Sequence, residues 1–66
     1  MNTATRFEGH NPAREAAQLQ SKKENCDVYV CKANLGGLVY FITKTNENLP
    51  NGTRILEHFK SGLKQK

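Results

Sequence analysis

Long hydrophobic runs are missing from this chain. The longest covers residues 38–42, LVYFI, whereas a membrane-spanning helix needs about 20 predominantly apolar residues. The first residues, MNTATRFEGHN, also lack the apolar core of a secretory signal. We therefore expect a soluble, cytoplasmic protein that makes no contact with a membrane.

Cysteine is scarce as well, with only Cys26 and Cys31 in the chain. We expect both on one extended strand, where their spacing corresponds to about 16 Å. A disulfide needs Cα atoms within about 7 Å of each other. The two side chains would also point to opposite faces of the strand. The sequence therefore predicts two reduced thiols, no disulfide and no shared zinc site.

Patterns that carry catalysis are also lacking. Nucleophilic catalysis needs a serine or cysteine activated by a base, and nothing in the sequence brings His10 or His58 close to either cysteine. The carboxylates are scattered, and Gly36-Gly37 is not followed by the helix and lysine of a phosphate-binding loop. We therefore expect no enzymatic activity, no cofactor, no metal and no small-molecule substrate.

The stretch around which the chain is organised is a predicted β-hairpin, with strands at about residues 26–32 and 38–44. Both runs are rich in β-branched and aromatic residues, and a glycine-containing turn separates them. A three-residue loop at 34–36 would set Val30 opposite Tyr40 and would make every central cross-strand pair apolar. Such pairs stabilise a sheet, so we expect this register.

Both faces of this hairpin are apolar. In that register, one face carries Cys26, Val28, Val30, Leu38, Tyr40 and Ile42, and the other carries Tyr29, Cys31, Val39 and Phe41. An antiparallel strand that is covered on one side usually alternates apolar and polar residues. The second face therefore needs a cover, which a helix, a partner or a ligand could provide.

Two helices are predicted on either side of the hairpin. Asn11 and Pro12 suit the start of a helix over about 12–24, whose apolar stripe is mostly alanine. A second helix is expected at about 54–61, because Ile55, Leu56 and Phe59 fall on one side at helical spacing. This second helix should cover the face of Val28 and Val30. Glu57 would lie on its outer side, Gly62 would stop it, and Leu63 would fold back on its last turn.

The predicted fold class is α+β with the order α-β-β-α. We expect residues 1–10 to form a disordered tail and residues 11–66 to form a single small domain. Only roughly 60% of the unfolded surface is buried in a domain of this size, so its stability is marginal without help. Dimerisation is one source of such help.

The function expected from these features is binding. The apolar residues Tyr29, Cys31, Val39 and Phe41 would form a surface for a protein partner, so that the chain acts as an inhibitor or adaptor of a larger protein, or pairs with itself as a homodimer. The alternative is a nucleic-acid-binding protein that stacks bases on Tyr29 and Phe41. The net charge is +4, and a basic patch of Arg54, Lys60, Lys64 and Lys66 near the C-terminus would hold phosphates.

Overall fold

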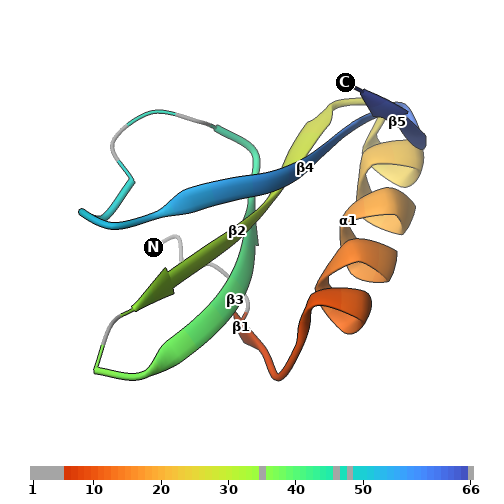
Figure 1. The fold of residues 1–66 in the computed structure, drawn as a ribbon. Coiled ribbons are helices and arrows are strands. Elements are labelled where there is room, and N and C mark those ends of the chain that lie inside the picture. Colours follow the sequence, from red (N-terminus) through yellow and green to blue (C-terminus); the bar gives the residue numbers. More distant parts are fainter. Residues whose placement is uncertain (1–5, 35, 46, 48, 66) are drawn as a thin grey trace.

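The computed structural model describes residues 6–34, 36–45, 47 and 49–65. In this part of the chain it contains one helix and one antiparallel sheet (Figure 1). The predicted α+β class and the central hairpin are confirmed, whereas the predicted order of elements is wrong. The elements are β1 (Arg6–Phe7), α1 (His10–Glu24), β2 (Asp27–Asn34), β3 (Leu38–Thr43), β4 (Arg54–Lys60) and β5 (Leu63–Gln65).

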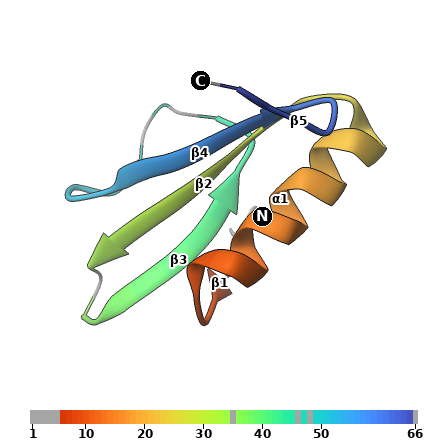
Figure 2. The ribbon, with the colours of Figure 1, turned by 45° about the vertical axis from the view of Figure 1, so that its right-hand side comes forward.

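The sheet has the strand order β1-β3-β2-β4-β5, with β2 in the centre. Helix α1 lies on one side of the sheet (Figures 1 and 2). Strands β3 and β4 both pair antiparallel with β2, so they run parallel to each other on either side of it. Leu49 in the connection between β3 and β4 packs against Cys31, Ala33 and Phe41, on the side away from α1. Both sides of β2 are therefore covered by the chain itself.

Small residues bring α1 close to the sheet. Ala13 and Ala17 are fully buried against Val28, Val30 and Phe59. The predicted N-terminal helix thus covers the face that we assigned to a C-terminal helix. An alanine stripe can do this because its short side chains let the helix approach closely. In the part of the chain that the structure describes, no helix has both the length and the apolar character needed to cross a bilayer.

Helix α1 begins at His10, two residues before the predicted start. Gly9 occupies the N-cap position in an extended conformation and contributes no side-chain cap, so Asn11 is not the cap. Tertiary contacts explain the earlier start. His10 Nε2 lies 2.5 Å from Glu57 Oε2, and its ring stacks on Tyr40 with centroids 6.3 Å apart.

The tail prediction for residues 1–10 is wrong from Arg6 onwards. Arg6 and Phe7 pair with Phe41 and Tyr40 as the edge strand β1. Phe7 also packs against the apolar cluster beneath α1. The partial burial of its ring holds β1 against the sheet. Residues 1–5 lie outside the described residues.

The hairpin of β2 and β3 forms with a register two residues from the predicted one. Val30 faces Ile42 rather than Tyr40, and Asn34 faces Leu38 at the closed end. The side chain of Asn34 selects this turn, since its Oδ1 accepts a hydrogen bond from the Gly37 N–H at 3.1 Å. Because side chains alternate with period two, a shift of two leaves every residue on its predicted face.

The predicted C-terminal helix at 54–61 is strand β4. Its residues pair with β2, and the register shifts between Val30 and Cys31, which face Glu57 and Ile55 respectively. Leu56 is therefore the extra residue of a β-bulge. The bulge breaks the period-two alternation, so Leu56 and Phe59 both reach the apolar cluster beneath α1. That spacing is what made the segment resemble a helix face.

The turn between β4 and β5 is docked on α1. Gln18 Nε2 donates a hydrogen bond to the Gly62 carbonyl at 3.1 Å, and the Gly62 N–H donates one to Ser21 Oγ at 2.9 Å. The side chain of Ser21 is buried and donates in turn to the Gln18 carbonyl. Ser61 and Gly62 have φ angles of 53° and 85°, as a two-residue type I′ turn requires. Gly62, predicted to stop a helix, instead closes a hairpin.

Replacing Gly62 with alanine should destabilise the protein more than replacing Gly52. Both glycines have φ 85°, so each substitution incurs the left-handed penalty of about 1–2 kcal/mol. Only at Gly62 would the new Cβ meet backbone-proximal atoms, 2.9 Å from Lys22 Cβ, whereas Gly52 has open space. We expect thermal unfolding to show a further loss of at least about 1 kcal/mol for Gly62→Ala. Equal losses would contradict the docking of this turn on α1.

Candidate binding surface

The predicted partner surface lies on one face of the sheet but is largely closed. Cys31 and Phe41 are buried within the chain, and Tyr29 and Val39 remain partly exposed around them. The cover is Leu49, from the connection between β3 and β4. A partner is therefore not needed to shield the centre of this face. Binding through Tyr29 and Val39 stays a prediction.

Tyr29 belongs to a polar cluster that the sequence did not reveal. Strand pairing sets His58 opposite Tyr29, and the two rings stack with centroids 4.3 Å apart and an interplanar angle of 15°. His58 Nε2 also lies 2.9 Å from Asp27 Oδ1. The helix prediction for 54–61 hid this cluster, since it placed His58 away from β2. Because the Tyr29 and His58 rings face each other, the base-stacking role predicted for Tyr29 loses one ring face.

The cysteines do not supply a nucleophile to this cluster. Cys31 is fully buried, and burial raises the pKa of its thiol to about 11, so the unreactive thiol form dominates at neutral pH. Cys26 packs on the opposite side, against the cluster beneath α1, as the predicted opposite orientation requires. Both thiols are free. Among the described residues, no group of three or more His, Cys, Asp or Glu side chains is placed to hold a metal ion.

The predicted basic patch is not one patch. Arg54 and Lys60 lie at opposite ends of β4, about 20 Å apart along an extended strand. Lys64 lies on β5, with its ammonium 3.4 Å from Glu57 Oε1. Lys66 is outside the described residues.

Glu57 is the least exposed carboxylate of the described residues, although the sequence placed it on the outer side of a helix. Its side chain is only 5% exposed. Oε2 pairs with His10 of α1, whereas Oε1 makes no hydrogen bond and has only the Lys64 ammonium nearby. Charged groups are rarely buried without a partner. The Glu57 carboxylate of β4 therefore connects His10 at the start of α1 with Lys64 of β5 through electrostatic contacts.

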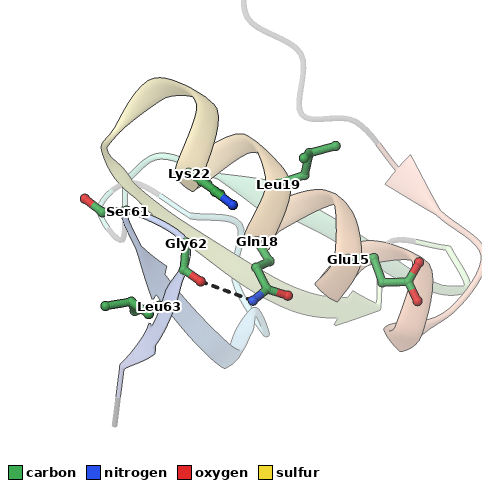
Figure 3. A pocket seen from close by; sticks show the side chains of 7 residues that line it. All are labelled: Glu15, Gln18, Leu19, Lys22, Ser61, Gly62 and Leu63. Atoms are coloured by element: carbon green, nitrogen blue, oxygen red, sulfur yellow. Dashed lines mark hydrogen bonds between the residues drawn. The ribbon is translucent and has the colours of Figure 1, made fainter.

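The most exposed large apolar side chains lie on a different surface. Leu19 of α1 is 67% exposed and Leu63 of β5 is 69% exposed. Both line one open depression of about 490 Å³, here called the α1–β5 depression, and Figure 3 shows the Gln18 amide reaching across from α1 to Gly62. Its lining residues are Glu15, Gln18, Leu19, Lys22, Ser61, Gly62 and Leu63.

The sequence could not predict this surface because it depends on β5. Leu63 was expected to fold back on a preceding helix, whereas the turn at Ser61 and Gly62 makes it part of an edge strand. The available signal was the Ser-Gly pair between two short β-compatible runs, since such a pair is typical of a tight hairpin.

Lysines without a carboxylate partner lie close to the depression. Lys22 is one of its lining residues, Lys23 follows on α1, and Lys60 directly precedes the turn. Within the ranges that the structure describes, none of these three forms an ion pair, whereas Lys44 donates to Glu24. That hydrogen bond lowers the pKa of the Glu24 carboxyl and raises that of Lys44. Glu15 in the lining and Asp27 opposite Lys60 also lie at this end, so among the described residues its four lysines exceed its three carboxylates by one charge.

Cys31 should resist alkylation in the native protein. Because its pKa is about 11 instead of 9.0, only about 1% of the thiol would be ionised at pH 9, against about half of an ordinary cysteine. We expect iodoacetamide to modify Cys26 first and Cys31 only in denaturant, as read by peptide mass spectrometry. The raised pKa also means that this group's contribution to stability is lost as pH rises from about 9 towards 11. Rapid native labelling of Cys31 at neutral pH would contradict its burial.

The chain was compared with known protein families, curated proteins and solved structures. No family model, no curated protein and no solved structure matches the chain. The residues that line the α1–β5 depression and the charges around it are therefore the basis for proposing a function.

Proposed function

We propose that the chain is a small non-enzymatic binding protein that acts in the cytosol on a larger protein, as an inhibitor or an adaptor. The α1–β5 depression is the binding surface. The observation that carries this proposal is the exposure of Leu19 and Leu63, which are far apart in the sequence and line the same depression. An exposed apolar patch with a polar rim is typical of an interaction site.

The physical basis of binding is the burial of these two leucines. Full burial of a leucine side chain contributes about 1.5–3 kcal/mol. The scaffold beneath is fixed by the hydrogen bonds between Gln18, Ser21 and Gly62, so docking would order few groups of this chain. A preformed surface loses less conformational entropy on binding than a mobile one.

Nucleic acid is the less favoured partner. The positive charge supports it, but two leucines offer no hydrogen bonds to bases or phosphates, and the Tyr29 ring is stacked on His58. Nucleic-acid binding rests mainly on charge and weakens steeply with salt. The two partners can therefore be separated by experiment.

The test is capture from a lysate of cells that produce the chain, using three tagged forms of the protein. Wild type and Leu38→Ser should retain the same protein partner, and the double variant Leu19→Ser, Leu63→Ser should lose it. Leu38 is a matched control because it is 62% exposed on β3, at the far end of its hairpin.

Two further measurements distinguish a protein partner from nucleic acid and from a second copy of the chain. Retention should survive nuclease treatment, and light scattering should give the monomer mass of 7.4 kDa for the isolated chain. Capture that the double variant leaves intact, or that nuclease abolishes, would contradict the proposal. A doubled mass that reverts to the monomer value in the double variant would make the partner a second copy of the chain.

A further inference from the structure

We infer that the occupant of the α1–β5 depression is an acidic segment of the partner protein, with leucine-sized side chains spaced among its carboxylates. This inference rests on the proposed function, since it names the chemistry of the partner at the same surface. Two observations carry it: the apolar pair Leu19 and Leu63, and the cations beside them.

The ion pairs among the described residues leave lysines around the depression without a partner. Asp27, Glu24 and Glu57 all have cationic or imidazole partners inside the molecule. Lys22, Lys23 and Lys60 form no such pair within the described ranges, and all three are exposed. The carboxylates near them are Glu15, which lines the depression, and Asp27, which faces Lys60 in the strand register and pairs with His58. Opposite charge on a partner therefore compensates them at little desolvation cost, since exposed ion pairs remain hydrated.

An occupant that carries only charged groups does not fit the two exposed leucines. A polyanion without apolar groups would leave Leu19 and Leu63 in water, and the gain from their burial would be lost. A cationic segment would bury the leucines but would lie next to Lys22. An acidic segment with apolar side chains satisfies both features, and complementary charges also speed the encounter.

A second copy of this chain fits the surface less well. In a two-fold contact the same patch meets itself, so the lysines of one copy would approach those of the other. Among the residues that line the depression, Glu15 is the one carboxylate available to compensate them. With a net charge of +4 on each chain, such a pair is opposed by repulsion.

The probes are three synthetic helical peptides. The first carries leucine at every third and fourth position with glutamate between, the second replaces the leucines with serine, and the third replaces the glutamates with lysine. Each is titrated into the isotope-labelled full chain while backbone amide shifts are recorded by NMR. A single-stranded oligonucleotide is titrated in parallel.

The leucine–glutamate peptide should shift amides in the second half of α1 and at residues 61–63. Its affinity should exceed that of the serine–glutamate and leucine–lysine peptides by about tenfold or more. Leu63→Ser and Lys22→Glu should each weaken it about tenfold, while Leu38→Ser leaves it unchanged. The amide spectrum of each free variant shows whether the fold is intact.

Equal binding of the serine–glutamate peptide or the oligonucleotide would reduce the site to charge alone and overturn the inference. Equal binding of the leucine–lysine peptide, or shifts centred on the β2–β3 turn, would also overturn it. If no acidic peptide binds while the lysate partner is still lost in the Leu19→Ser, Leu63→Ser variant, this inference fails and the proposed function stands. If that partner is also unaffected, both fail.

Discussion

Strand β2 is apolar on both of its faces, and the rest of the chain is arranged to cover it. Val28 and Val30 point towards α1, whereas Cys31 and Ala33 point away from it, and all four are buried. An antiparallel strand in a small domain can leave one face in water, but β2 cannot. The chain covers one face with α1 and places Leu49, which follows β3 in the sequence, against the other.

Helix α1 covers the sheet by lying close to it rather than by inserting large side chains. Ala13, Ala17 and Ser21 give α1 a flat inner face, which lets Gly62 come against Lys22. Leu19, the largest apolar side chain of the helix, is on the outside. In a chain with so few large apolar residues, each exposed leucine forgoes burial that would stabilise the fold. Leu38 is exposed as well, but Leu19 and Leu63 line one depression, and this shared position is the physical reason to propose a function for these two.

Much of the inner structure followed from the sequence, because it depends on local pattern. The helix over 12–24 and the alternation of β2 and β3 were correct, and the faces survived a register shift of two residues. Strand β4 was missed because its β-bulge near Leu56 imitates helical spacing. The α1–β5 depression was missed with it, since Leu63 joins that surface only through the pairing of β4 with β5.

The fold requires that the chain itself covers the face of β2 that points away from α1. The most direct test is an NMR measurement of proton–proton contacts from the Leu49 methyl groups in a sample that light scattering shows to be monomeric. We predict contacts from Leu49 to the Phe41 ring and the Ala33 methyl group. Absence of these contacts, with Phe41 accessible to a paramagnetic probe in the solvent, would show that the outer face of β2 is open and would contradict the account.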